Sequence, residues 1–343
     1  MHGAAAFHAD YDMMLPRLLL FALSCALVAS PLLAQSVRRC ASCGQVLLDD
    51  YVEAEGRYFH SHHFRCEYCG KPIASLYVPV EGKFYHGECY QRRFTVMCVV
   101  CNKAILEAYQ EDYWGNPAHA AHSTDTPACD FCGRFIVRGF VANSVEMPDG
   151  RRLCGLCAPT SVTTLDEARE LMSTTAAALR KHGIRVATDD IPVLLLPRDR
   201  MQMLSHDAEQ NVKGFTDYVI APQADGKWKA ETFNIDLLYG MPEIETTYAL
   251  AHELMHVWLA RRGVGRDDQD QALVEGSCSY ASFLVMSDLD TRESEFVAHR
   301  IQSEPDSVYG GGFRRVKGYV DANGVEAWLK ALASGATITA PGK

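Results

Sequence analysis

A histidine pair with a glutamate between its members is the first pattern in this sequence that could do chemistry. Residues 252–256 read His-Glu-Leu-Met-His, an H-E-x-x-H sequence. On a helix, the spacing of four places His252 and His256 on one face, one turn apart, where they can share a metal ion. Glu253 then lies beside that face as a candidate general base. The apolar neighbours are typical of a buried helix, which we expect to begin after Pro242 and to end near Arg262.

A catalytic zinc site needs a third protein ligand, and Glu275 is the candidate. It lies 19 residues after His256, on a helix predicted over about residues 269–287. A glutamate from the following helix matches the gluzincin layout, a His2Glu site. Asp267 and Asp268 are rival ligands, but the loop that carries them would have to fold back sharply. No H-x-x-G-x-x-H spacing follows, which argues against the metzincin class.

These residue types together predict zinc-dependent hydrolysis of peptide bonds. Zinc on three protein ligands keeps a position for water and lowers its pKa toward about 7. Glu253 would take a proton as water attacks the scissile carbonyl, and pass it to the leaving amine. A strand predicted over residues 227–239 precedes the helix, and we expect it to be a sheet edge that pairs with extended substrate.

Cysteine pairs fill the segment from Cys40 to Cys157, which holds eleven cysteines, ten of them in C-x2-C pairs. Two close pairs of cysteine or histidine can supply the four ligands of a structural zinc. Disulfides are the alternative in a secreted chain, but they leave five histidines at matching positions unexplained. The expected sites are Cys40, Cys43, His60 and His63; Cys66, Cys69, His86 and Cys89; Cys98, Cys101, His119 and His122; and Cys129, Cys132, Cys154 and Cys157.

The first two sites together resemble a LIM domain over about residues 38–92. The last two are LIM-like, because six residues separate His122 from Cys129 where a LIM domain has two. Metal replaces a large core in modules of this size, and LIM-like modules commonly bind other proteins. We therefore expect about five zinc ions per chain, one catalytic and about four structural. We also expect the modules to dock a substrate or a protein partner.

The predicted fold is multidomain, with two small zinc-ribbon or LIM-type β modules before an α+β gluzincin-like metallopeptidase domain. The expected divisions are a signal peptide over 1–34, a LIM domain over 35–95, a LIM-like module over 96–160 and the peptidase domain over 161–343. In the last part, a capping box at Thr164 predicts a helix that runs to about His182.

The first 34 residues are typical of a secretory signal peptide. Arg17 precedes an apolar run that ends at a small-residue cleavage site before Gln35. This predicts an exported chain, periplasmic or secreted, with no membrane span after cleavage; an uncleaved anchor is the alternative. The formal net charge of −10 argues against a general nucleic-acid binder.

The order of these parts resembles the ubiquitin-activated LIM peptidases of plants that regulate organ size. The likeness covers roughly residues 38–320. It rests on LYGMP (238–242), HELMHVWL (252–259), VEGSC (274–278) and a stretch over 299–314 that ends in VYGGGFR.

This resemblance implies an endopeptidase that acts on proteins, with the 299–314 stretch near the active site. Tyr309 and His299 are then the candidates for an additional oxyanion donor. Plant members carry ubiquitin-interacting segments where this chain has its predicted signal peptide, so ubiquitin activation is not carried over. Two other hypotheses remain: a LIM-based interaction scaffold with a latent or inactive peptidase domain, and a metallohydrolase of smaller amides.

Overall fold

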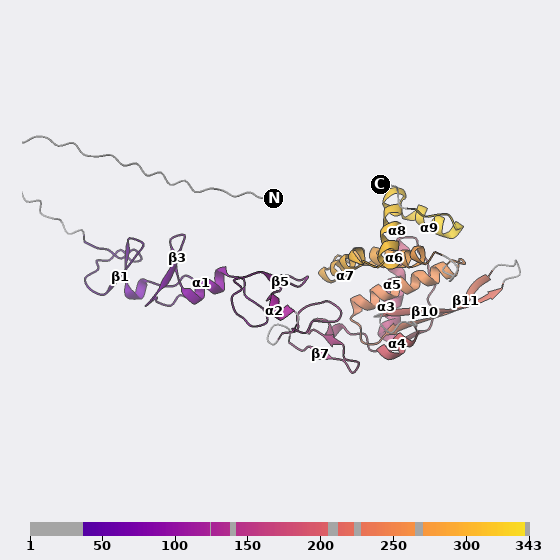
Figure 1. Ribbon diagram of the computed structural model, residues 1–343, viewed down its shortest axis with the longest axis horizontal. Coiled ribbons are helices and arrows are strands. Elements are labelled where there is room, and N and C mark those ends of the chain that lie inside the picture. Colours follow the sequence, from indigo (N-terminus) through magenta and orange to yellow (C-terminus); the bar gives the residue numbers. More distant parts are fainter. Residues whose placement is uncertain are drawn as a thin grey trace, which may run out of the picture. The chain divides into compact units, whose positions relative to one another are not determined.

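The structure is a computed structural model that describes residues 37–123, 125–137, 142–204, 212–222, 228–264 and 270–339. The predicted signal peptide and the rival ligands Asp267 and Asp268 lie outside the described residues. The chain divides into two compact units between Cys89 and Tyr90, and Figure 1 shows the elements of both. Within the described segments, no helix is long and apolar enough to cross a membrane.

Two short antiparallel hairpins build the first unit. They are β1 (Tyr51–Ala54) with β2 (Arg57–His60), and β3 (Tyr77–Val80) with β4 (Lys83–His86); the turn η1 (Ser61–His63) and the helix α1 (Gly87–Phe94) follow them. The core is a cluster of Phe59, Phe64 and Phe84, with ring centroids 4.8 to 5.6 Å apart. Strands of four residues around three rings bury little apolar surface, so this unit depends on metal for stability.

The second unit begins with two more small hairpins. They are β5 (Tyr109–Glu111) with β6 (Pro117–His119), and β7 (Val145–Glu146) with β8 (Arg152–Leu153); the short helices are α2 (Ala120–Ser123) and η2 (Ala158–Thr160). Cys98 of the third cysteine cluster packs in a small core with Ile105 and Phe135. The four cysteines of the fourth cluster instead belong to the large core of the helices that follow. This core continues across residue 160, where the sequence suggested a domain boundary.

A three-stranded sheet supports the rest of the unit. Its order is β10 (Gly214–Pro222), β11 (Trp228–Leu238) and β9 (Val193–Leu196), with β11 antiparallel to β10 and parallel to β9. The prediction that residues 227–239 form a sheet edge is therefore wrong, because β11 lies between two partners. The edge next to the H-E-x-x-H helix is β10, whose first residues line the pocket described below.

Helices cover this sheet and form the remainder of the unit. The capping box at Thr164 is confirmed: its side chain accepts from the Glu167 amide, and Glu167 accepts from the Thr164 amide. The helices are α3 (Leu165–Lys181), α4 (Arg198–Leu204), α5 (Glu243–Ala260), α6 (Gln271–Leu289), α7 (Arg292–Ser303), α8 (Tyr309–Asn323) and α9 (Val325–Ser334).

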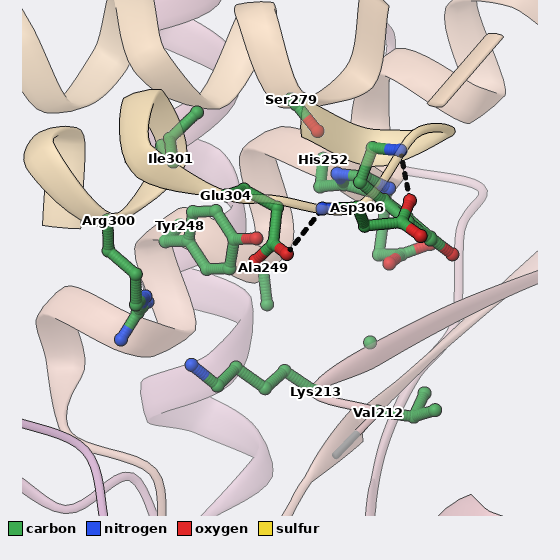
Figure 2. Close-up of a pocket in the computed structure, with 13 residues that line it drawn as sticks. Val212, Lys213, Tyr248, Ala249, His252, Ser279, Arg300, Ile301, Glu304 and Asp306 are labelled. Carbon is green, nitrogen blue, oxygen red and sulfur yellow. Dashed lines mark hydrogen bonds between the residues drawn. The ribbon is translucent and has the colours of Figure 1, made fainter. Parts of the chain in front are cut away.

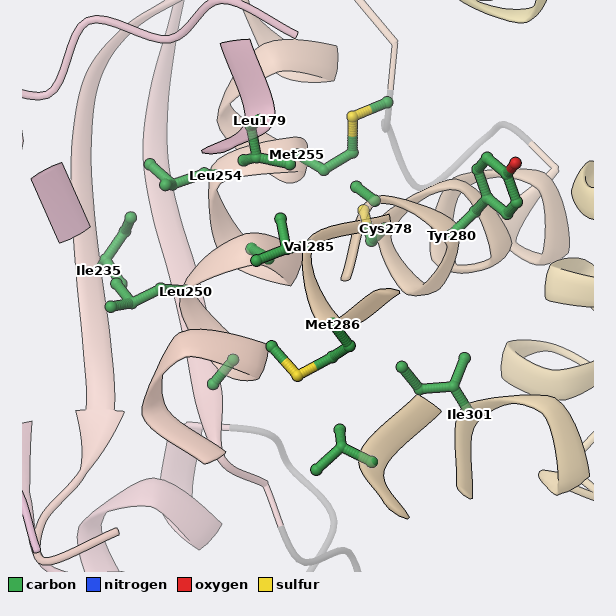
Figure 3. Packing of buried hydrophobic residues seen from close by; sticks show 14 of the residues in the cluster. Leu179, Ile235, Leu250, Leu254, Met255, Cys278, Tyr280, Val285, Met286 and Ile301 are labelled. Atoms are coloured by element: carbon green, nitrogen blue, oxygen red, sulfur yellow. The ribbon is translucent and has the colours of Figure 1, made fainter. Parts of the chain in front are cut away.

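Helix α5 is the centre of the core. It packs against β10 and β11 on one side and against α6 on another. Leu250 and Leu254 are fully buried, and Figure 3 shows Leu250 beside Ile235 of β11, with Cys278 of α6 on the opposite side. Because α5 is enclosed by packed elements, the side chains that it directs toward the pocket are held in place.

Helices α6 and α8 cross at a pair of glycines. A Cβ added at Gly276 would fall on the backbone of Gly312, and one added at Gly312 would fall on the carbonyl oxygen of Ala272. Only glycine permits two helix backbones to approach this closely. The approach brings the first residue of α8, Tyr309, toward the histidines of α5.

Candidate functional site

Two histidines of α5 and one glutamate of α6 converge on a single point. Glu275 Oε2 lies 3.0 Å from His252 Nε2 and 3.5 Å from His256 Nε2. Three ligands that each lie about 2.0 to 2.2 Å from a tetrahedral zinc are separated by distances of this size. The three side chains are mostly buried, with 12 to 21% of their surface exposed. The two distances therefore suit three ligands of one divalent metal.

The electrostatics of this cluster also favour a cation. Burial acts to raise the pKa of Glu275, but the neighbouring histidines outweigh it and hold that pKa well below its usual range. For His256, burial acts to lower the pKa, while Cys278 and Glu275 raise it well above its usual value. Both pKa shifts show that the buried carboxylate and imidazoles stabilise positive charge between them. A bound zinc would supply that charge.

Cys278 lies directly behind the histidines. Its side chain is fully buried, and its sulfur is within 4.8 Å of a ring nitrogen of each histidine. Burial raises the pKa of this thiol to about 11. Its complete burial is typical of a cysteine that packs as a small apolar residue of the core.

Glu253 is held by the edge strand and not by the metal cluster. The hydroxyl of Thr216 donates to Glu253 Oε2 over 2.7 Å. A Cβ added at Gly214 would lie 2.6 Å from Glu253 Oε1, so β10 approaches the carboxylate more closely than any residue with a side chain allows. The contacts of Thr216 and Gly214 with Glu253 could not be predicted from the sequence, because no local pattern links a strand to a helix more than 30 residues later.

If the site hydrolyses peptides, as the sequence predicts, Thr216→Val should lower kcat by about 10-fold or more, because a hydrogen bond to a charged group contributes about 1.5–3 kcal/mol. Thr216→Ser retains the hydroxyl and should keep most of the activity. Both variants should retain the zinc content of the parent. Equal kcat values for the valine and serine variants would contradict this role of the hydroxyl.

A pocket of about 560 Å³ opens beside His252 and Glu253. Figure 2 shows Lys213, Tyr248 and Arg300 around it. Tyr309 also lines this pocket, and its ring stacks on that of His252 with centroids 6.2 Å apart. The other oxyanion candidate, His299, packs on the ring of Tyr113 at 5.4 Å, and the described pocket lining does not include it.

Two cations that line the pocket, Lys213 and Arg300, share the buried carboxylate of Glu245. The side chain of Glu245, on α5, is 2% exposed and accepts two hydrogen bonds from Arg300 and one from Lys213, each of 2.7 Å. Burial acts to raise the pKa of Glu245, but the two cations lower it to about 2. Two positive charges thus share one buried carboxylate next to the candidate metal centre.

The sequence-predicted zinc ligands come together as four separate clusters. In each one, the ligand atoms of its four residues lie within 4.8 Å of one another. Cys40 Sγ lies 3.6 Å from His63 Nδ1, so His63 and not His62 completes the first cluster. Cys132 and Cys154 are 3.6 Å apart at sulfur, which suits two thiolates on one zinc and is far longer than a disulfide bond. All twelve cysteines of the described residues are free.

Known proteins match both parts of this architecture. Residues 40–94 match the LIM domain family, and residues 201–290 match a DA1-like family described as Protein DA1. Protein DA1 of Arabidopsis thaliana is 24% identical over 290 residues, which cover 66% of this chain and 53% of that protein. Protein DA1-related 2 of the same plant is 27% identical, covering 66% of this chain and 55% of its own length. The LIM domain-containing protein HDR3 of Oryza sativa subsp. japonica is 24% identical, covering 70% and 61%.

The similarity to these plant proteins covers only part of their length. The chain spans about half the length of the Arabidopsis relatives that it matches. The DA1-like match includes the histidines of α5 and Glu275 of α6. LIM-type zinc-binding modules are thus followed by a DA1-like region, and the chain is homologous to the plant DA1 proteins.

Proposed function

We propose that this chain is a zinc-dependent endopeptidase of the gluzincin type. The observation that carries the proposal is the convergence of His252, His256 and Glu275 on one point, with Glu253 beside them at the mouth of a pocket. Three protein ligands and one open position are the composition of a catalytic zinc site. A closed set of four ligands, as in the cysteine clusters, is the composition of a structural one.

The roles of the residues follow from their positions. Zinc bound at such a site activates water and polarises a carbonyl group. Glu253, oriented by Thr216, accepts the proton of the attacking water and returns it to the leaving amine. Among the described strands β10 is an edge strand, and its first residue, Gly214, lines the pocket, so β10 is the strand along which an extended peptide would lie. An edge strand binds any extended main chain, which favours an endopeptidase over a hydrolase of small amides.

Tyr309 is the proposed donor to the oxyanion. Burial raises the pKa of its phenol, so the group stays protonated and can donate. We expect Tyr309→Phe to lower kcat by about 10²-fold, the effect of removing one oxyanion donor, with zinc content unchanged. An unchanged kcat would remove Tyr309 from the mechanism.

The modules before the DA1-like region are proposed to dock the substrate or a partner protein, since LIM domains are protein-interaction modules. The predicted signal peptide would direct this activity to the periplasm or outside the cell. A substrate is then a protein or peptide of that compartment.

The test of this function is cleavage of a mixed peptide substrate in the presence of a zinc chelator. A phenanthroline chelator should stop cleavage, and added zinc should restore it. The non-chelating isomer of the same compound is the matched control and should have no effect. Cleavage that persists after the catalytic zinc has been removed would contradict the proposal.

A further inference from the structure

The fourth cysteine cluster is built into the catalytic core. Cys129, Cys132, Cys154 and Cys157 are at most 8% exposed, and they share one buried cluster with helices α3, α5 and α6. The hairpin between the two cysteine pairs has strands of only two residues. Such a hairpin has no stability of its own, so the metal determines the shape of this segment.

The first cysteine pair is bound to α7. The carbonyl of Phe131, between Cys129 and Cys132, accepts from Arg300 Nη1 over 3.3 Å. The carbonyl of Cys132 accepts from the Trp114 indole over 2.7 Å. Arg134, two residues further on, pairs with Glu293 at the start of α7, also at 3.3 Å.

The second cysteine pair is bound to the segment that leads into α5. Arg151, held by Asp149, donates to the carbonyl of Tyr239 over 2.7 Å. After Cys157, the backbone of Val162 exchanges two hydrogen bonds with Gly240 and Met241, of 2.9 and 2.8 Å. Helix α5 starts directly after these residues, at Glu243.

Arg300 joins the cysteine cluster to the pocket. The same guanidinium that binds Phe131 also holds both oxygens of Glu245 and lines the pocket beside His252. A metal bound by Cys129 and Cys132 would fix the conformation of the turn between them, and with it the direction of the Phe131 carbonyl. The position of Arg300 therefore depends on whether the cysteines hold their metal.

We propose that the metal of Cys129, Cys132, Cys154 and Cys157 is a positioning element of the active site, which acts on peptide binding through Phe131 and Arg300. Loss of this metal releases Arg300 and the start of α5 while the ligands on the later turns of α5 and on α6 stay in place. The effect on KM rests on the proposed peptidase function; the effect on the backbone does not.

The test uses the full chain with Cys157→Ser, and Cys66→Ser as the matched control, since Cys66 belongs to a cluster of the first unit. Each variant should lose one zinc. Only Cys157→Ser should show faster amide hydrogen exchange over 239–246 and 292–303, with α6 still protected. Cys157→Ser should also raise KM, by about 10-fold, as expected for losing a hydrogen bond to a charged group, with kcat within about twofold. Cys66→Ser is compared by exchange alone, because its module is proposed to dock the substrate.

Arg300→Lys carries the test if Cys157→Ser does not fold. Lysine keeps the charge beside Glu245 but lacks the planar fork with which Arg300 binds both Glu245 oxygens and the Phe131 carbonyl. This variant should keep all its zinc and show the same rise in KM. Unchanged KM and exchange in a folded Cys157→Ser protein would overturn the proposal. So would equally fast exchange over 239–246 and 292–303 in Cys66→Ser, or an unchanged KM in Arg300→Lys. A parent chain that cleaves no peptide but shows the exchange changes would reject the peptidase function alone.

Discussion

Glu275→Gln is expected to remove one zinc per chain and to lower peptide cleavage by at least about 10³-fold. An amide binds zinc far more weakly than a carboxylate, and two histidines alone make an incomplete site. The substitution also removes the negative charge that stabilises both imidazoles in their buried positions. Zinc analysis of the purified variant should therefore fall by one ion per chain, from about five to about four.

Glu326→Gln is the matched control for this experiment. This substitution makes the same change in charge and size at an exposed residue in the first turn of α9. It should leave zinc content and kcat at the parent values. A Glu275→Gln protein that kept its full zinc content and its activity would exclude Glu275 as a ligand.

Gly312→Ala is expected to destabilise the fold by about 3 kcal/mol or more. The added methyl would fall on the Ala272 carbonyl and close to the backbone of Gly276. Both are main-chain atoms of a packed helix, so relief requires α6 and α8 to move apart, and overpacking of this kind costs about 1–3 kcal/mol or more. Chemical denaturation of the two proteins measures the difference.

Gly311→Ala, in the residue before Gly312, is not expected to destabilise the fold. A methyl there meets only the Asp306 carbonyl, at an ordinary 3.8 Å. Since alanine favours a helix over glycine by about 1 kcal/mol, this variant should be equally stable or slightly more stable. Equal losses for Gly311→Ala and Gly312→Ala would contradict this explanation, because only Gly312 lies against the backbone of α6.

Elements with strong local signals could be predicted from the sequence. The predicted helices containing His252 and Glu275 correspond to α5 and α6, because each has a long apolar pattern and clear ends. The capping box of α3 is a purely local device. The spacing of cysteines and histidines likewise anticipated the four clusters, because metal geometry restricts where ligands can stand in the chain.

Features that depend on distant partners could not be predicted. The glycines of 310–312 disfavour a helix locally, yet α8 contains them; Gly312 permits the close approach of α6, and Gly310 lies against the carbonyl of Glu304. The position of β11 inside the sheet depends on β9, more than 30 residues earlier. Glu245 has the sequence position of an ordinary polar residue in the first turn of a helix, and only its contacts with Lys213 and Arg300 connect it to the pocket that these two residues line.

Analysis of new peptide termini is the most direct test of the central claim that Glu253 and its neighbouring metal site hydrolyse peptide bonds. A complex peptide mixture is incubated with the full chain or with Glu253→Gln, both of equal zinc content and fold, and the products are sequenced by mass spectrometry. We predict new termini with the parent chain and a rate at least about 10²-fold lower with Glu253→Gln, the contribution of a general base. The same products at the same rate from both proteins would contradict the account.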